Sequence, residues 1–163
     1  MQFRKARPDE RTAVAALYRS VIGQPGSTWD EHYPGEIHLQ QDFSGGNAYV
    51  LLHDGVIIGA VSVIVPREYD ELGFWQVCDG GQCEIGRVVI DRAAQGHGYA
   101  REMLSRLMTQ LASEGFRAVH VLAAEGNPPA RHTYEKLGFL PRGTYAMYGN
   151  NYVAYEKLLP ADA

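Results

Sequence analysis

The sequence predicts an α/β domain built on a mixed, mostly antiparallel sheet with helices on both faces. Three observations carry this prediction. An apolar run is followed by a glycine turn and an amphipathic helix, a second strand–helix unit comes further along, and pairs of strands are joined by tight turns. The chain has 163 residues, the size of one ordinary domain, and shows no linker or internal repeat. We therefore expect residues 1–163 to form a single domain.

The N-terminal part begins with a strand and a helix. Residues 3–7 are predicted as the first strand, and Pro8 opens a helix at the position that proline prefers. Gly23 ends this helix, and a further short helix is expected around 34–43. The first helix has an apolar face at helical spacing, made of Val14, Leu17, Tyr18 and Val21.

The central part alternates strands with one long helix. Strands are expected at 48–53 and 56–65, because the Asp54-Gly55 dipeptide between them suits a two-residue type I′ hairpin. The loop 66–81 leads to a strand at 82–90. The helix that follows has one continuous apolar stripe, made of Ala100, Met103, Leu104, Leu107, Met108 and Leu111. Gly115 supplies its end.

The C-terminal part predicts a buried strand at 119–123, a short helix and two closing strands. The closing strands, 142–147 and 151–158, form a pair around Gly149-Asn150. The expected order is therefore β-α-(α)-β-β-β-α-β-α-β-β.

Composition excludes several classes of partner. The formal charge is -4 and the pI is about 5.8, which argues against a nucleic-acid-binding surface. No apolar stretch approaches the length of about 18 residues that a membrane span needs, and no apolar leader follows Met1, so we expect a cytoplasmic protein. Cys78 and Cys83 are interpreted as free thiols, and no further ligands stand near them, so no metal is expected.

The glycine turn before the long helix predicts a phosphate site. Gly96 and Gly98 let backbone N–H groups converge on an anion at the start of a helix, where the helix dipole adds attraction. A P-loop would end in Gly-Lys-Ser/Thr, whereas this loop ends in Gly-Tyr-Ala. The dinucleotide fingerprint needs a third glycine where Arg101 stands, and an acidic residue about 20 positions on, where Val119 and His120 stand.

A third interpretation fits both this loop and a downstream motif. Gln95-Gly96-His97-Gly98-Tyr99-Ala100 resembles the Gln/Arg-x-x-Gly-x-Gly/Ala signature of the GNAT superfamily of N-acetyltransferases. Downstream, Asn127 follows a buried strand and precedes a short helix and Tyr-Glu-Lys-Leu-Gly-Phe at 134–139, which looks like the second GNAT signature. On these two motifs the chain is identified as a member over roughly residues 1–159. The resemblance implies the GNAT (acyl-CoA N-acyltransferase) fold and acetyl-CoA as acyl donor.

The resemblance also assigns the coenzyme contacts. Backbone N–H groups of the loop would face the pyrophosphate, strand residues 88–90 would pair with the pantetheine arm and donate to the thioester carbonyl, and Asn127 would hydrogen-bond the pantetheine. The expected contact residues are Val88, Val89, Ile90, Gln95, Gly96, His97, Gly98, Tyr99, Ala100, Arg101, Asn127 and Tyr134. His97 either adds charge near the phosphates or is an exposed loop histidine, and Asn127 is otherwise a turn asparagine.

Two residues are expected to carry the acid–base chemistry. By resemblance, the Tyr134 phenol lies beside the coenzyme sulfur and protonates the departing thiolate; the alternative is a packing tyrosine. Glu84 lies where the histone-acetyltransferase branch carries its general base, and a partly desolvated carboxylate has a raised pKa that suits this work. The alternative is a glutamate that is exposed or paired with Arg87.

The acceptor is expected where the segment 24–46 and the loop 66–81 meet the sheet. Aromatic side chains available there are Trp29, Tyr33, Tyr69, Phe74 and Trp75, and Gln82 shares the strand face of Glu84. We take Trp29, Tyr33, Trp75 and Gln82 as candidate substrate contacts. Acidic residues in both segments favour a cationic amine, although such residues also form solvated rims.

The sequence thus predicts an enzyme that transfers an acetyl group from acetyl-CoA to a primary amine of a small molecule or peptide by direct attack. The alternative is a non-catalytic acyl-CoA-binding sensor or interaction module of the same fold. Use of a longer acyl donor also stays open, and a homodimer is compatible with the sequence.

Overall fold

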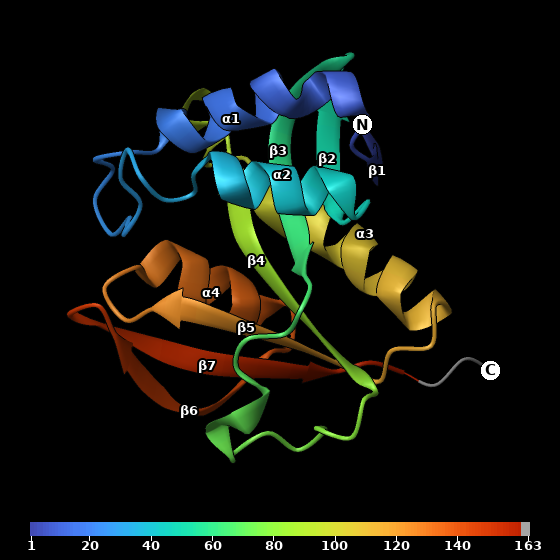
Figure 1. Ribbon diagram of the computed structural model, residues 1–163, viewed down its shortest axis with the longest axis vertical. Helices are drawn as coiled ribbons and strands as arrows, with labels where there is room; N and C mark the ends of the chain where they lie inside the picture. The colour runs from blue at the N-terminus through green and yellow to red at the C-terminus, as the bar shows by residue number, and fades with distance from the viewer. Residues whose placement is uncertain (161–163) are drawn as a thin grey trace.

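One seven-stranded sheet organises the computed structural model, which describes residues 1–160 (Figure 1). The strands are β1 (Gln2–Lys5), β2 (Ala48–His53), β3 (Val56–Ile64), β4 (Gln82–Ile90), β5 (Ala118–Ala124), β6 (Leu140–Met147) and β7 (Asn150–Leu158). Their order across the sheet is β1-β2-β3-β4-β5-β7-β6. β4 and β5 run parallel, and every other neighbouring pair is antiparallel, so the predicted mixed, mostly antiparallel sheet is confirmed. The last three residues of the expected 1–163 domain lie outside the described residues.

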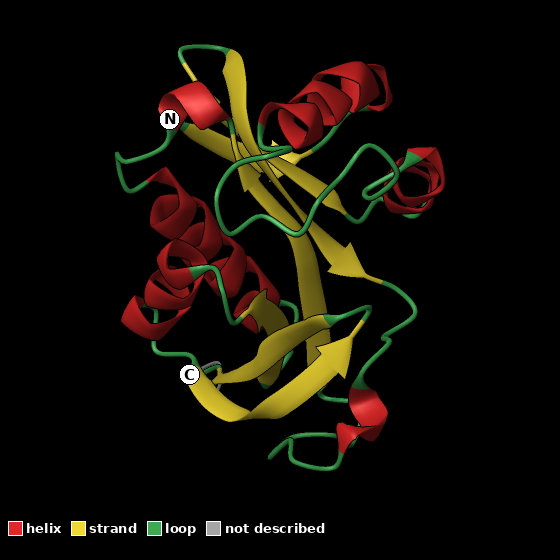
Figure 2. Ribbon diagram, turned by 90° about the vertical axis from the view of Figure 1, so that its left-hand side faces the viewer, coloured by secondary structure: helices red, strands yellow, loops and turns green. Residues whose placement is uncertain are grey.

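Helices cover both faces of the sheet (Figure 2). They are α1 (Arg11–Ser20), α2 (Glu36–Ser44), α3 (Tyr99–Ser113) and α4 (Pro128–Lys136). Buried side chains of α1 and α2 form a cluster with β2, β3 and Val89 of β4. Side chains of α3 and α4 form a second, larger cluster against the opposite face. A buried side chain of the sheet thus lies on the α3–α4 face if it belongs to the larger cluster, and on the α1–α2 face if it belongs to the smaller one.

The chain enters α1 through a turn rather than directly. Pro8 begins a 3-10 turn, Pro8–Glu10, and the α-helix begins at Arg11. Glu10 stabilises this turn, because its carboxylate accepts a hydrogen bond from the Arg7 N–H at 2.7 Å. The same carboxylate forms a bidentate ion pair with Arg4 of β1, with both N–O distances 2.8 Å.

The tight turns follow backbone geometry. Asp54 and Gly55 have φ of 51° and 79°, and two consecutive positive φ values are what the predicted type I′ turn requires. In the β6–β7 hairpin the positive φ values belong to Tyr148 and Gly149, at 51° and 78°. The predicted Gly149-Asn150 turn was therefore wrong by one residue, since Asn150 already pairs with Met147 in the sheet.

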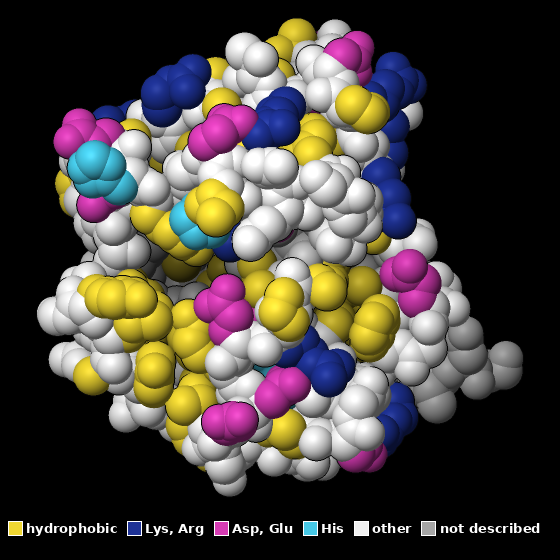
Figure 3. Space-filling view, in the orientation of Figure 1, with side chains coloured by type: hydrophobic (Ala, Val, Ile, Leu, Met, Phe, Trp, Pro, Cys, Tyr) yellow, Lys and Arg dark blue, Asp and Glu magenta, His cyan; other side chains and the backbone are white. Residues whose placement is uncertain are grey.

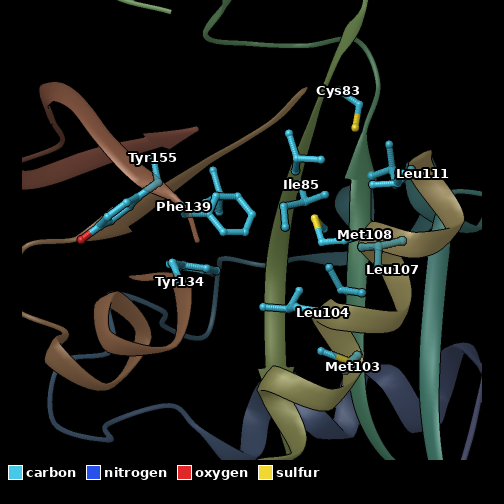
Figure 4. Close-up of a cluster of buried hydrophobic side chains, with 14 of the residues drawn as sticks. Cys83, Ile85, Met103, Leu104, Leu107, Met108, Leu111, Tyr134, Phe139 and Tyr155 are labelled. Carbon is cyan, nitrogen blue, oxygen red and sulfur yellow. The ribbon is translucent and has the colours of Figure 1, made fainter. Parts of the chain in front are cut away.

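The larger core lies beneath α3. The predicted stripe is confirmed, because its residues from Met103 to Leu111 are buried. Figure 4 shows the leucine and methionine side chains of α3 facing Cys83 and Ile85 of β4, with Tyr134, Phe139 and Tyr155 on the α4 side. This core ties α3 and α4 to the two strands, β4 and β5, that bound the site described next.

Across residues 1–160, no helix combines the length and apolar character that crossing a membrane requires.

Candidate functional site

The site is created where β4 and β5 separate. Their parallel pairing consists of Gln82 with Ala118, Cys83 with Val119 and Glu84 with His120, and it stops there. Residues 85–90 of β4 consequently have no paired residue on β5. Figure 3 shows the surface hollowed across its middle, between the half with α2 and the half with β6 and β7, with hydrophobic side chains gathered around the hollow. An extended ligand could pair with the free edge of β4 there.

The glycine turn at the end of this opening has the geometry of an anion site. Gly96 and Gly98 have φ of 84° and 79°, conformations that residues with a Cβ adopt at a cost. Gly98 caps α3, so the N–H groups of the first helical turn, from Tyr99 onward, have no partner within the helix. A cavity of about 450 Å³ lies at this helix start, lined by His97, Gly98, Arg101, Glu102, Ser105 and Leu137.

Side chains in the same loop brace it from within. Gln95 Nε2 donates to the Ile90 carbonyl at 3.2 Å and to Gln24 Oε1 at 3.0 Å. The His97 ring nitrogen Nδ1 lies 3.1 Å from the Ala94 carbonyl, and the Tyr99 hydroxyl lies 3.1 Å from a ring nitrogen of His53. These contacts hold the loop in shape, so the predicted contacts of this loop with a ligand rest on its backbone N–H groups.

β4 carries a bulge opposite β3. Ala60 pairs with Val89 and Ser62 pairs with Gly86, so one residue of β3 faces two residues of β4, Arg87 and Val88. Arg87 and Val88 therefore lack a paired residue on β3 as well as on β5. Among the predicted pantetheine contacts, Val89 and Ile90 are buried core side chains, while Val88 is half-buried. The bulge leaves backbone groups beside Val88 available to a ligand.

Glu84 is a buried carboxylate that has no cationic partner among residues 1–160. Its side chain accepts a hydrogen bond from the Glu68 N–H at 3.2 Å, and the residue is 5% exposed. Burial raises the pKa of Glu84 to about 7, against the opposing effect of the Glu68 hydrogen bond. The alternative that Glu84 pairs with Arg87 was wrong, because Arg87 pairs with Asp42 at 2.7 Å. The expected raised pKa is thus present.

Tyr134 lies in the core of the α4 side. Its ring packs against Phe139 and Tyr155, with ring centroids 5.5 Å and 5.9 Å away, and points from α4 toward β4 in Figure 4. Burial raises the pKa of its phenol, so the group stays protonated at neutral pH. The hydroxyl makes no hydrogen bond within residues 1–160. This environment suits a proton donor and also a packing residue.

Asn127 is the N-cap of α4. Its side-chain oxygen accepts a hydrogen bond from the Ala130 N–H at 3.3 Å. This is the turn role that the sequence left as an alternative, and it leaves the side-chain amide N–H groups as donors for the predicted pantetheine contact.

The four candidate substrate contacts differ in their surroundings. Tyr33 is 41% exposed, and its hydroxyl lies 3.5 Å from a guanidinium nitrogen of Arg87. Trp29 instead packs edge-on against Tyr18 of α1, with ring centroids 5.4 Å apart. Gln82 is 2% exposed, and its side-chain oxygen accepts a hydrogen bond from the Gly80 N–H at 2.9 Å. Tyr33 is more exposed than Trp29 and Gln82, so it is the stronger of these candidates.

Trp75 belongs to a cluster with His120 and Glu156 that anchors the loop 66–81. Its ring stacks on His120 of β5 at a centroid distance of 3.8 Å and an interplanar angle of 9°. Its indole N–H donates to the Tyr69 carbonyl at 2.7 Å. Tyr69 is thereby held, and its pKa is raised first by burial and then by the charges of Glu68 and Glu84. The same loop contacts Glu84 through the Glu68 N–H, 3.2 Å from the carboxylate.

Glu156 of β7 lies at the centre of that cluster. Its carboxylate accepts hydrogen bonds from the N–H groups of Gln76 and Val77 and from Arg142 Nε, and lies 2.8 Å from His120 Nε2. Burial alone would raise the pKa of Glu156, but these hydrogen bonds outweigh it and lower the pKa. No local pattern in the sequence indicates this role for Glu156, because its partners come from β5, β6 and a loop.

Within residues 1–160 no group of three or more His, Cys, Asp or Glu side chains is placed to hold a metal ion. Cys78 and Cys83 are free thiols, as predicted.

The chain is similar to known acetyltransferases. A family profile described as Acetyltransferase (GNAT) family matches residues 14–139. An acetyltransferase of the GNAT family from Streptococcus agalactiae shares 23% sequence identity and a TM-score of 0.81, over 98% of this chain and 95% of that chain. The fold expected from the resemblance is therefore confirmed. Among curated proteins, none matches this chain.

Two further solved structures of this fold contain the coenzyme. A putative acetyltransferase from Salmonella typhimurium, solved with its cofactor acetyl-CoA, has 19% identity and a TM-score of 0.76, over 100% of this chain and 96% of that chain. A GNAT superfamily phosphinothricin acetyltransferase from Sinorhizobium meliloti, in complex with AcCoA, has 19% identity and a TM-score of 0.75, over 97% and 88%.

Replacing Glu84 should change stability in a pH-dependent way. Because its folded pKa of about 7 lies above the ordinary value of 4.5, the folded state binds the proton more tightly, and stability falls as pH rises between these values. Glu84→Gln should raise the free energy of unfolding by up to about 3 kcal/mol at about pH 8, and by little below about pH 4.5. Denaturant titrations at several pH values measure this.

Glu10→Gln is the matched control with the opposite sign. Its hydrogen bond from Arg4 lowers the pKa of Glu10 to about 2, so this carboxylate stabilises the fold above its ordinary pKa, and the stabilisation is lost as pH falls. Glu10→Gln should therefore destabilise the protein at neutral pH. Equal effects of both variants at about pH 8 would contradict the burial argument for Glu84.

Proposed function

Because the chain belongs to the GNAT acetyltransferase family, we propose that it transfers the acetyl group of acetyl-CoA to a primary amine of a small molecule or peptide. One observation carries the proposal. A buried carboxylate with a pKa near neutrality, Glu84, stands at the point where β4 and β5 separate, and the anion-binding turn closes the other end of the same strand. We take residues 1–163 as one domain that carries this activity.

The residues present fit acetyl-CoA. Its pyrophosphate needs converging N–H donors, which Gly96, Gly98 and the first turn of α3 offer beside a cavity of about 450 Å³. Its pantetheine arm needs an unpaired strand edge, which β4 offers beyond Glu84. When bound, the coenzyme supplies an activated acetyl group as a thioester. We assign to the Val88 N–H, which is part of the bulge, a hydrogen bond to the thioester carbonyl.

Two proton transfers are assigned to this chain. The attacking amine must lose a proton, and Glu84 can accept it directly or through one water, because a base with a pKa of about 7 is half deprotonated near neutral pH. The departing thiolate must gain a proton, and the Tyr134 phenol holds one at neutral pH. Both groups flank the region where β4 and β5 part.

The acceptor side of the site favours a cationic amine. Tyr33 and Tyr69 come from the two predicted acceptor segments, and the charges of Glu68 and Glu84 both act on Tyr69. Carboxylates and aromatic faces attract an ammonium group, so these residues support an amine that arrives protonated. A protonated amine would also require the base that Glu84 provides.

The direct test is thiol release from acetyl-CoA with a panel of polyamines, amino acids, aminoglycosides and short peptides. Turnover with one class would establish the activity and name the acceptor. Coenzyme binding by calorimetry without turnover on any amine would contradict the enzyme and favour a non-catalytic acyl-CoA-binding module. Repeating the active reaction with longer acyl-CoA donors would define the donor.

The acid–base assignment predicts two separable kinetic effects. The kcat/KM of the wild type should fall below about pH 7 as Glu84 becomes protonated, and Glu84→Gln should lower the rate by about 10²–10⁴-fold and flatten this limb. Tyr134→Phe should lower kcat by a similar factor with unchanged affinity for acetyl-CoA, because only the hydroxyl is lost. If Tyr134→Phe matches the wild-type rate, this tyrosine has only a packing role.

The phosphate assignment predicts loss of coenzyme binding in Gly98→Asp. A carboxylate at the start of α3 would repel the pyrophosphate, and calorimetry should show at least a hundredfold loss of affinity, about 3 kcal/mol. Gly115→Asp is the matched control at the other end of α3. Its φ is also positive, at 94°, and a Cβ meets no atom within 4 Å at either glycine. Equal affinities in the two variants would remove the phosphate site from α3.

A further inference from the structure

The bulge in β4 changes which face of the sheet its side chains occupy. Cys83 and Ile85 join the core beneath α3, so Glu84 between them lies on the opposite face. Strict alternation would next place residues 86, 88 and 90 on the face of Glu84. Instead Ile90 joins the α3 core, while Val89 joins the cluster beneath α1 and α2. The extra residue therefore brings Arg87 onto the same face as Glu84.

Arg87 adopts an unfavourable backbone conformation to make this bulge. Its φ is 49°, in the left-handed region, where the Cβ of a non-glycine residue comes close to a backbone carbonyl oxygen. Such a conformation persists only where the surroundings hold it. The contacts of the Arg87 side chain therefore stabilise the bulge.

Asp42 of α2 holds the Arg87 side chain in place. Arg87 Nε and Nη2 donate to the two carboxylate oxygens of Asp42, both at 2.7 Å, and the two side chains are 5% and 4% exposed. Ser62 of β3 adds a third hydrogen bond to Asp42, at 2.6 Å. Ser62 is also the residue at which regular β3–β4 pairing stops, opposite Gly86. The carboxylate thus ties both strands of the bulge to α2.

The same guanidinium reaches the acceptor side of the site. Its remaining nitrogen, Nη1, lies 3.5 Å from the Tyr33 hydroxyl. One planar group therefore connects α2, the bulge and a half-exposed aromatic residue of the segment before α2. A planar guanidinium in a two-point contact has a defined orientation, which a lysine ammonium in its place would not have.

We propose that the buried Asp42–Arg87 pair is a positioning device for acetyl transfer. It holds the bulge so that the Val88 N–H is aimed at the thioester carbonyl oxygen of acetyl-CoA. This inference rests on the proposed function of β4. Asp42 touches neither substrate and acts through Arg87. Because hydrogen-bond donors act on a developing charge only when they are placed within a fraction of an ångström, loosening the bulge should reduce the rate rather than the binding of the coenzyme.

The test is Asp42→Asn, which keeps the shape of the side chain and removes the charge that Arg87 requires. We expect kcat to fall by about ten- to a hundredfold, with the dissociation constant of acetyl-CoA within about twofold of wild type, because the phosphates are held at α3. Arg87→Lys is the second variant. It keeps the buried positive charge but loses the two-point contact, and it should show the same division between kcat and binding.

Glu10→Gln is the matched control for a purely structural effect. The Arg4–Glu10 pair is also bidentate, with both distances 2.8 Å, and joins β1 to the turn before α1. This variant should lower the melting temperature and leave kcat at the wild-type value. All rates are measured well below the melting temperature of each variant. Loss of stability with wild-type kcat in Asp42→Asn and Arg87→Lys would overturn the proposal.

A second readout does not depend on turnover. The infrared carbonyl frequency of bound acetyl-CoA, isotope-labelled at the acetyl carbonyl, falls when that oxygen accepts a hydrogen bond. We expect a lowered frequency in the wild type and in Glu10→Gln, and a return toward the free value in Asp42→Asn. A wild-type protein that turns over no amine but shows this pattern would refute the enzyme and retain the positioning role. An equal frequency in wild type and Asp42→Asn would overturn the positioning role itself.

Discussion

The pairing between β4 and β5 is the constraint on which the rest of the structure depends. Three residue pairs join these strands, from Gln82 with Ala118 to Glu84 with His120. If the pairing continued, β4 would have no free edge and Glu84 would lie inside an ordinary parallel sheet. Because it stops, the sheet divides into an N-terminal half of four strands and a C-terminal half of three, with the site between them. Because the β4–β5 pairing is so short, other contacts are needed to hold the two halves of the sheet together.

Two such contacts are visible on opposite faces. Beneath α3 and α4, the larger core spans both halves, from Leu51 of β2 to Tyr155 of β7. On the other face the loop between β3 and β4 crosses to the C-terminal half, where Glu156 accepts hydrogen bonds from its backbone and Trp75 stacks on His120. A buried carboxylate is stabilised only when its hydrogen bonds replace water, and four partners do so here. The loop that carries Tyr69 is therefore held by the C-terminal half while its Glu68 N–H contacts the base candidate of the N-terminal half.

The buried charges have contrasting roles because their partners differ. Asp42 accepts two hydrogen bonds from Arg87, and Glu156 accepts hydrogen bonds from two backbone N–H groups and Arg142 that lower its pKa, so both carboxylates organise the backbone around them. Among the described residues Glu84 has one N–H partner and no cationic partner, and burial raises its pKa to about 7. A buried carboxylate thus anchors structure at one position and has a raised pKa at another, according to how completely its oxygens are hydrogen-bonded. This contrast distinguishes Glu84 from the two hydrogen-bonded carboxylates, Asp42 and Glu156.

Local patterns in the sequence determined the helices and strands and the glycine turn before α3. The stripe of α3, the Asp54-Gly55 hairpin and the glycines at 96 and 98 depend on spacing and on backbone preferences within a few residues, and the structure contains all of them. Glu84 was also accessible from sequence, through its place on a strand of a recognised motif. Tertiary structure alone decided that Arg87 pairs with Asp42 rather than Glu84, that Trp29 packs against Tyr18, and that Glu156 anchors a loop. Arg87 and Asp42 lie 45 residues apart in the chain, and Glu156 and Gln76 lie 80 apart. A charged side chain takes the partner that the packed elements bring within hydrogen-bond distance, and no local pattern records that distance.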